Sequence, residues 1–279
     1  MRDSVGNGQQ DRAGTPMSRK TYLWGGYTAL YIAALYAPVA FLIIFAFNDS
    51  TAIAFPLSGF TTRWFSAMAG SPGLVEALGN SLKVSSSAAV ISTVLGTLAA
   101  KALSRTALPG RPALTGILTL PLLIPGIVMG IALLIVSGTV GLQLSLVTIG
   151  IAHVVYTTPF AILIMLPRFE GFDRNLEEVS LDLGEGLFFT FVRVVLPLAA
   201  PGIVSSLLLT FTVSLDEFVL TFFLAGNETT LPLYIWSQLR FPGKLPGVLA
   251  LSTCILCFSF VLVTLAEWVR RRGTPANPQ

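Results

Sequence analysis

Six long apolar stretches alternate with short polar connections along the chain. A membrane-spanning helix needs about 20 consecutive, mostly apolar residues. Lipid offers the backbone no hydrogen-bond partners, so each stretch is expected to be helical. The pattern predicts an all-α membrane protein with six transmembrane helices, at residues 27–47, 81–103, 113–136, 142–166, 198–223 and 246–269.

The composition supports a membrane protein and excludes an ordinary soluble domain. Hydrophobic residues make up 53% of the 279 residues and charged residues 11%, whereas a soluble domain carries about 25% charged residues. With six spans both termini share one side, and that side holds thirteen of the 17 Lys and Arg residues. Positive residues accumulate on the cytoplasmic side, so both termini are expected to be cytoplasmic. The net charge of +3 then reflects topology and gives no reason to expect nucleic-acid binding.

The ends of the chain differ from its middle. Residues 1–20 contain Gly, Asp and Gln and are expected to form a disordered cytoplasmic N-terminus. Residues 21–272 are expected to form one six-helix domain, and residues 273–279 a cytoplasmic tail. The first apolar run is longer than the core of a signal peptide, so the first span is expected to be retained.

The connection at residues 168–197 is the long one predicted to face the cytoplasm, and it has a helical pattern. Its first part, residues 174–183, places apolar side chains on one helical face and acids on the other. The apolar positions are Leu176, Val179 and Leu183. An amphipathic helix of this kind either docks on another protein or lies on lipid. Glu177, Glu178, Asp182 and Glu185 would face anionic headgroups, which favours docking.

The second part of the 168–197 loop reads as a turn followed by a rigid connection. Gly184 and Gly186 can turn the chain where a Cβ would clash. Residues 187–195 form a second apolar helical piece. Pro197 then starts the fifth span, where a missing N–H costs least. A push on residues 174–183 would therefore reach the fifth span.

The 168–197 loop resembles the EAA signature of permease subunits from bacterial ABC importers. That signature is Glu-Ala-Ala, three residues, Gly, nine residues, Ile, one residue and Leu-Pro. The matching run here is Glu178-Val179-Ser180, three residues that include Asp182, then Gly184, nine residues, Val194, one residue and Leu196-Pro197. The two alanines and the isoleucine of the signature are replaced, whereas the Glu, the Gly and the Leu-Pro pair are in register.

Three further stretches resemble the spermidine/putrescine-type permeases of that family. They are residues 59–64, 121–134 and 211–240. Two positions depart from that type: Gly126 stands where such permeases have an acid, and Gly247-Val248-Leu249 replaces Glu-x-Asn after Pro246. The solute is then a polyamine, a smaller or less charged amine, or an unrelated molecule, and a partner permease can also supply the acids.

The resemblance implies the type I ABC importer permease fold and the partners of such a subunit. These are a second, similar permease, a dimer of ATP-binding subunits, an extracytoplasmic solute-binding protein and the bacterial inner membrane. The coupling residues implied are Glu178, Val179, Ser180, Asp182, Gly184, Leu196 and Pro197. ATP and Mg are expected in the partner subunits, since the sequence has no G-x-x-x-x-G-K-[ST] run. We expect no catalytic residue, cofactor or metal site in this chain.

Two adjacent acids lie within the predicted fifth span. Charged residues inside a span are costly and are functional candidates, so Asp216 and Glu217 are candidate ligands for a cationic amine. A structural explanation is equally specific, because Ser214-x-x-Glu217 fits a capping box at a helix break. Both can hold together.

Other polar or aromatic positions in the spans and outer loops are weaker candidates. His153 and Tyr156 could line the solute path, although a lone histidine in a bundle is usually a hydrogen-bonded structural group. Trp64 and Trp236 could hold a cation over the ring face, although interfacial anchoring is the commoner role. Cys254 and Cys257 are expected to be buried apolar residues rather than a redox or metal pair.

Two other classes of protein remain as competing hypotheses. A self-contained secondary transporter or channel would carry solute without an ATP-binding partner, and the chain has no obvious inverted repeat. A membrane enzyme would need a nucleophile or metal set, and the sequence has a single His and neither H-E-x-x-H nor G-x-S-x-G.

Overall fold

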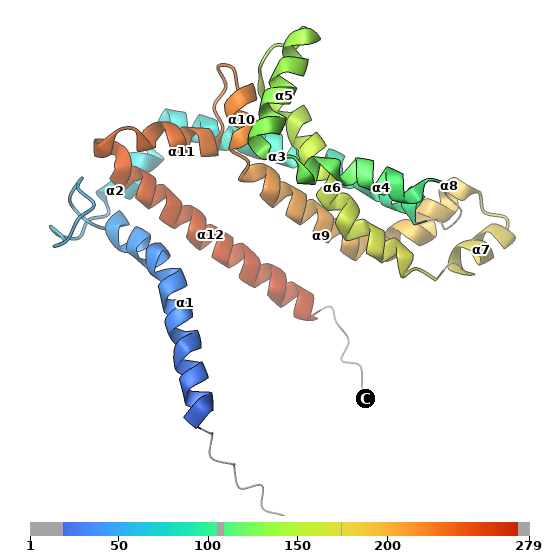
Figure 1. The fold of residues 1–279 in the computed structure, drawn as a ribbon, viewed down its shortest axis with the longest axis horizontal. Helices are drawn as coiled ribbons and strands as arrows, with labels where there is room; N and C mark the ends of the chain where they lie inside the picture. The colour runs from blue at the N-terminus through green and yellow to red at the C-terminus, as the bar shows by residue number, and fades with distance from the viewer. Residues whose placement is uncertain (1–18, 105–108, 174, 273–279) are drawn as a thin grey trace, which may run out of the picture. The chain divides into compact units, whose positions relative to one another are not determined.

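The computed structural model describes residues 19–104, 109–173 and 175–272. The remaining residues, which include most of the N-terminus predicted to be disordered and the predicted C-terminal tail, lie outside the described part. The chain divides into two compact units (Figure 1). Unit 1 comprises residues 1–64 and 249–279, and unit 2 comprises residues 65–248.

The described residues form helices joined by short connections, with no strand beyond one isolated bridge between Asn48 and Phe60. In chain order the helices are α1 Arg19–Ala46, α2 Arg63–Ala69, α3 Pro72–Leu103, α4 Arg111–Thr119, η1 Leu120–Leu123, α5 Gly126–Thr139, α6 Leu146–Glu170, α7 Asn175–Asp182, α8 Leu187–Thr190, η2 Phe191–Val195, α9 Leu196–Leu215, α10 Val219–Leu224, α11 Leu231–Leu239, η3 Pro242–Lys244 and α12 Leu245–Arg272.

Five described helices are long and apolar enough to span a membrane, or six if one bent pair counts as a span. That pair, Arg111–Leu123 and Gly126–Thr139, bends by 101°, so the third span predicted at residues 113–136 is broken into two helices. Pro125 explains the bend: proline has no N–H to continue the helix, and it forces the preceding residue, Ile124, into an extended conformation. Figure 1 shows α5 standing away from the direction of α4.

The boundaries of two other predicted spans also differ from the structure. The second span begins at Pro72 rather than at residue 81, with Ser71 as the residue before the helix. The fifth begins at Leu187 and ends at Leu215, whereas residues 198–223 were predicted. Residues 216–218 interrupt the helix, and α10 follows them.

The centre of unit 2 consists of α3, α6 and α9, which lie side by side (Figure 1). Gly96 allows α3 and α6 to approach, because a Cβ at this position would lie 2.4 Å from the Cβ of Ala161. Buried hydroxyls join the helices: Ser92 Oγ lies 2.7 Å from Thr157 Oγ1, and Thr93 Oγ1 lies 3.3 Å from Ser206 Oγ. Small and hydroxyl side chains are typical of packed membrane helices, where lipid supplies no hydrophobic drive for association.

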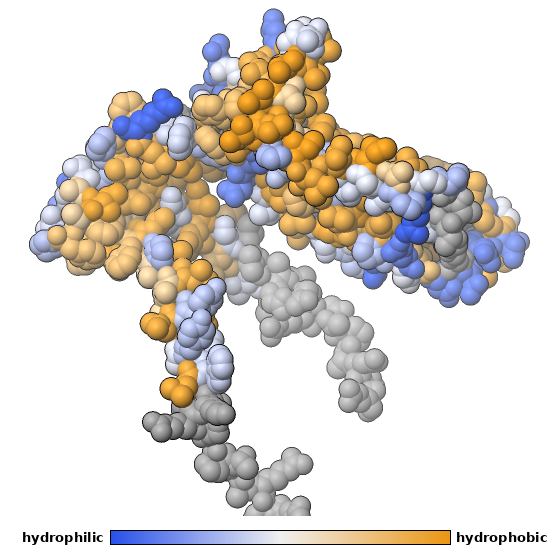
Figure 2. Space-filling view, viewed as in Figure 1, coloured by the Kyte–Doolittle hydropathy of each residue, from blue (hydrophilic) through white to orange (hydrophobic). Residues whose placement is uncertain are grey.

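Two apolar clusters occupy opposite parts of this helical core. The first, here named the break-end core, surrounds α10 and consists of Val84, Met129, Ile149, Ala152, Leu220, Leu224 and Ala225. The second, the loop-end core, lies where α9 begins and consists of Ala100, Met165, Phe169, Val195 and Ala199. Figure 2 shows apolar side chains over α4, α5 and α6, and hydrophilic ones gathered at the end of unit 2 that holds α7.

Unit 1 contains α1 and a loop that folds back on itself. Asn48 is buried, and its Oδ1 accepts a hydrogen bond from the N–H of Ser58 at 3.0 Å. The indole N–H of Trp64 donates to the carbonyl of Asn48 at 2.8 Å, and the guanidinium of Arg63 lies over the indole ring. Trp64 therefore holds this loop together.

Candidate transport site and coupling loop

The helix break at residues 216–218 contains two carboxylates that differ in exposure and in hydrogen bonding. Asp216 follows the last residue of α9; its side chain is exposed and has no hydrogen-bond or ionic partner among the described residues. Glu217 is partly buried, and its Oε1 accepts the backbone N–H of Leu220 at 3.0 Å. Glu217 thus caps α10, and Asp216 is the carboxylate at the break without a partner among the described residues.

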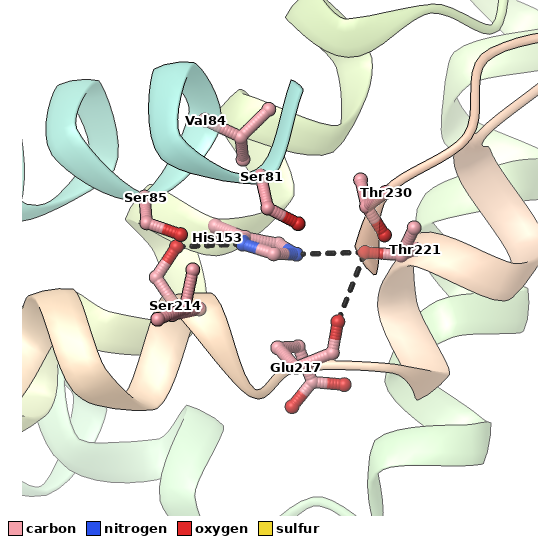
Figure 3. A pocket seen from close by; sticks show the side chains of 9 residues that line it. Ser81, Val84, Ser85, His153, Ser214, Glu217, Thr221 and Thr230 are labelled. Carbon is pink, nitrogen blue, oxygen red and sulfur yellow. Dashed lines mark hydrogen bonds between the residues drawn. The ribbon is translucent and has the colours of Figure 1, made fainter. Parts of the chain in front are cut away.

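The predicted capping box does not form, because the carboxylate of Glu217 accepts the N–H of Leu220, three residues ahead, instead of the N–H of Ser214. Ser214 does not cap α10, because its Oγ lies 2.8 Å from Nδ1 of His153 in α6. The other ring nitrogen of His153, Nε2, lies 3.2 Å from Oγ1 of Thr221 in α10. Figure 3 shows the imidazole between these two hydroxyls. His153 thereby contacts both sides of the break.

A small polar cavity surrounds this histidine (Figure 3). Side chains fill it almost completely, so the volume open to a water molecule is about 0 Å³, far below the several hundred Å³ of a site for a drug-sized ligand. Two buried hydroxyls that line it, Ser85 Oγ and Thr230 Oγ1, have no hydrogen-bond partner in the described part of the chain. The lining residues are Ser81, Val84, Ser85, His153, Ser214, Leu215, Glu217, Thr221 and Thr230. Asp216 is outside this lining, so the cavity is a packed polar cluster behind the acid.

Aromatic rings flank the break. The ring of Phe218 lies 5.4 Å from that of Trp236 in α11, and Trp236 is 44% exposed. Tyr156 is one turn after His153 and packs its ring 5.8 Å from Phe160. The structure therefore brings His153, Ser214 and Glu217 together and places Trp236 against the same break. Trp64 lies in unit 1 and is engaged there by Asn48.

The acidic helix predicted at residues 174–183 is present as α7, and its end explains the glycine after it. Gly184 has φ +89°, a left-handed conformation that favours glycine. Its N–H donates to Leu181 O at 2.9 Å, and the N–H of Glu185 donates to Ser180 O at 3.2 Å. These two bonds form a Schellman motif, which closes the helix end. Gly186 has φ −77°, so its conformation does not require glycine.

Ion pairs and one hydroxyl contact fasten α7 and the turn after it. Lys101 of α3 pairs with Glu177, and Arg193 pairs with Glu185 at 2.5 Å. Ser180 Oγ lies 3.0 Å from Thr190 Oγ1. Together these contacts link α7 and the turn after it to the end of α3 and to the helix that follows.

The outer surface of this segment is unusually apolar for a connection between helices. Leu183 is 80% exposed, and Leu187 and Phe188 are each 71% exposed. Glu178, Val179 and Asp182 are also exposed. We call Glu178, Val179, Asp182, Leu183, Leu187 and Phe188 the loop surface. It combines acids with large apolar side chains, which is the composition of a protein contact rather than of a solvated turn.

The exit from the 168–197 loop differs from the prediction. Pro197 does not begin a new helix, since the chain is helical without interruption from Leu187 to Leu215. A π-turn at Phe191–Val195 lies directly before Leu196 and Pro197. Proline cannot donate the backbone hydrogen bond of a regular helix, and the wider turn accommodates that loss. The link into the fifth span is therefore a continuous helix.

The two cysteines are not buried as predicted. Cys254 and Cys257 are free and exposed on α12. No group of three or more His, Cys, Asp or Glu side chains suited to a metal ion occurs among the described residues.

Comparison with known proteins identifies the family. Residues 92–274 match the family described as "Binding-protein-dependent transport system inner membrane component". The chain belongs to this family. Its members are non-catalytic permease subunits of ABC importers; they work with other components of the transporter, and the ATPase is a separate subunit. The protein is thus a multi-pass membrane component of an ABC importer.

Two curated relatives and one solved structure resemble this permease over most of its length. It is 34% identical over 256 residues to the spermidine/putrescine transport system permease protein PotC of Escherichia coli strain K12, covering 91% of this chain and 96% of that protein. It is 34% identical over 230 residues to the putrescine transport system permease protein PotI of the same strain, covering 80% and 81%. A chain of a bacterial ABC transporter that imports the acidic polysaccharide alginate matches with a TM-score of 0.70 and 17% identity, covering 94% of this chain and 100% of that one. The last comparison confirms the predicted importer permease fold.

Proposed function

We propose that this permease forms half of the path through which an ATP-driven importer carries polyamines, such as spermidine or putrescine, or a related organic cation. The observation that carries the proposal is the exposed, unpartnered carboxylate of Asp216 at the helix break. An ammonium group gains from a carboxylate and from an aromatic face, and Trp236 packs on Phe218 beside that carboxylate. The similarity to two polyamine permeases over most of the chain supports the same solute class.

The loop surface is the proposed docking site for an ATP-binding subunit at the cytoplasmic face. This requires both termini to be cytoplasmic, as the distribution of Lys and Arg predicts. The exposed apolar side chains of Leu183, Leu187 and Phe188 support a protein contact. The continuous helix from Leu187 to Leu215 provides a rigid route from that contact to Asp216. ATP and Mg belong to the partner subunits in this proposal, and a second permease completes the path.

The test is transport by the whole complex in proteoliposomes. The permease is reconstituted with its second permease, its ATP-binding subunits and its solute-binding protein. Uptake of radiolabelled putrescine and spermidine and the stimulation of ATP hydrolysis are compared with those for an uncharged sugar and for molybdate. We expect amines to stimulate both activities and the other two solutes to leave them at the basal rate. Stimulation by the sugar or by molybdate alone would replace the polyamine proposal, and uptake without ATP-binding subunits would favour a secondary transporter.

The role of Asp216 is tested in the same complex by Asp216→Asn. Loss of a charged partner for an ammonium group should lower amine uptake roughly ten-fold or more, because a hydrogen bond to a charged group contributes about 1.5–3 kcal/mol. Glu76→Gln is the matched control, since Glu76 is another exposed carboxylate of unit 2. Equal uptake by the Asp216→Asn variant and the control, with equal amounts of assembled complex, would remove Asp216 from the solute path.

A further inference from the structure

His153 joins the two helices that the break separates. Its ring is almost fully buried, with 2% of the residue exposed. Nδ1 reaches Ser214, the second-last residue of α9, and Nε2 reaches Thr221 in α10. The imidazole, which comes from α6, thus joins the helices on either side of residues 216–218, as Figure 3 shows. No other side chain of the described residues forms hydrogen bonds with both Ser214 and Thr221.

Counting protons gives the direction of these hydrogen bonds. The hydroxyl of Thr221 donates its one proton to the backbone carbonyl of Glu217 at 3.0 Å. Thr221 Oγ1 must then accept from His153, so Nε2 carries the ring proton of a neutral imidazole. Nδ1 is left as an acceptor and receives the hydroxyl proton of Ser214. The chain of donors therefore runs from Ser214 through His153 and Thr221 to the carbonyl of Glu217.

This chain ends on the residue whose side chain caps α10. Glu217 is held at its carbonyl by Thr221 and at its carboxylate by the N–H of Leu220. Asp216 lies between Ser214 and Glu217, and its backbone N–H bonds to Thr212 O at 3.2 Å. Fixing the backbone on both sides of Asp216 fixes the direction of its Cα–Cβ bond and so the region that its free carboxylate can reach.

We propose that His153 is a positioning residue that sets the geometry of the α9–α10 break and thereby orients the carboxylate of Asp216 toward the solute path. His153 acts through Ser214 and Thr221 and does not itself touch the solute. The effect on the break follows from the contacts of this chain alone. The effect on uptake rests on the proposed function.

The first test measures the break directly, in the complete reconstituted complex and without solute. His153→Phe keeps a planar ring and removes both hydrogen bonds. Amide hydrogen exchange across residues 216–224 should become roughly 25- to 100-fold faster, since each of the two lost hydrogen bonds contributes about a factor of five to ten. Thr158→Val is the matched control, because Thr158 Oγ1 bonds only to its own helix at Val154 O. Unchanged exchange in His153→Phe would overturn the proposal.

A second pair of variants tests the same bridge if the His153→Phe variant does not fold. Ser214→Ala and Thr221→Val each remove one end of the bridge and leave the ring in place. Both should accelerate exchange at the break, and His153→Gln, which keeps one donor and one acceptor, should restore part of the protection. Acceleration by His153→Phe without acceleration by either hydroxyl variant would assign the effect to ring packing and overturn the proposal.

The last test links the break to transport by a double-mutant cycle with Asp216→Asn. If His153 acts by orienting Asp216, then His153→Phe lowers amine uptake roughly ten-fold in the wild-type background and little further in the Asp216→Asn background. Equal losses in both backgrounds would overturn the orienting role. If Asp216→Asn itself leaves uptake unchanged, the proposed solute path fails, and the exchange measurements alone then decide whether His153 positions the break.

Discussion

The break and the 168–197 loop lie near opposite ends of the same apolar helix, and they are stabilised in different ways. At the break, buried side chains of unit 2 satisfy one another: His153, Ser214 and Thr221 form a continuous hydrogen-bonded chain. At the loop, partly or largely exposed ion pairs hold α7, while Leu183 and Leu187 remain exposed. The break is completed by its own chain, whereas the loop has an apolar surface that this chain does not cover.

This difference matches the tasks proposed for the two regions. A solute contact gains from a carboxylate held in one direction before the solute arrives. A docking element gains from exposed apolar side chains that the partner buries. The helix from Leu187 to Leu215 connects them, so under the proposed function a displacement of the loop would be carried toward Asp216.

The largest predicted effect comes from the backbone that shapes the loop. Gly184→Ala forces a Cβ into φ +89° and should weaken the Schellman motif after α7 by about 1–2 kcal/mol. The loop surface then loses its geometry, so ATP hydrolysis should continue while solute uptake falls several-fold. The measurement is the ratio of ATP hydrolysed to solute transported in proteoliposomes.

Gly186→Ala is the matched control for this variant. Gly186 has φ −77°, and an added Cβ would meet nothing within 4 Å. Its ratio of hydrolysis to transport should equal that of the wild type. If both variants uncouple ATP hydrolysis from transport equally, the flexibility of glycine rather than the left-handed cap determines coupling. The loop then does not depend on a fixed backbone geometry.

A moderate effect is expected from the ion pair that ties α7 to α3. Lys101→Met removes the partner of Glu177, in a pair whose side chains are 17% and 24% exposed. We expect a loss of about 1 kcal/mol in the thermal stability of the complex, at the upper end of the range for surface pairs. Arg193→Met should cost less, because Arg193 and Glu185 are 64% and 36% exposed.

A double-mutant cycle with Glu177→Gln separates the ion pair from other contributions of Lys101. Coupling should appear between Lys101 and Glu177 and should weaken at high salt. A salt-independent coupling would instead point to other contacts of Lys101, whose Nζ lies 5.6 Å from the ring centroid of Phe169.

The smallest effect is expected from adding a carboxylate beside the break. A Cβ at Gly126 would lie 3.7 Å from the Cβ of Val219, an ordinary contact, so a small side chain fits there. Gly126→Asp should raise the affinity of the complex for divalent amines by no more than about two-fold, in line with modest charge interactions near solvent. Gly126→Asn controls for size. Equal affinities in the two variants would show that position 126 does not face the bound amine.

Hydropathy predicted the helices well because lipid selects length and composition, and both can be read from a sequence. It could not predict the bend at Pro125, since hydropathy measures how apolar a stretch is and not its direction. Proline can kink a helix, yet Pro159 lies inside the uninterrupted helix α6. Whether a proline bends a helix depends on whether neighbouring segments satisfy the freed backbone groups.

The two candidate regions were predictable to different extents. Gly184 could be predicted, because its role depends on a local turn. The amphipathic pattern of the helix that precedes it can be read directly from the sequence. The partner of Ser214 could not, because His153 is 61 residues away and local spacing favoured a capping box. The chain of hydroxyls at the break is a tertiary feature, and its one signal in the sequence was a single histidine within an apolar span.

The π-turn at Phe191–Val195 also determines the angular phase of the helix that contains it. An α-helix advances about 100° per residue, and a π-turn adds one residue to a single turn. Side chains before the π-turn are therefore rotated by about 100° about the helix axis, relative to their positions in a regular α-helix without the extra residue. This offset lets Val195 and Ala199 enter the loop-end core while Leu187 and Phe188 remain exposed. One helix thus presents two apolar stripes in two directions, one to its own bundle and one to the outside.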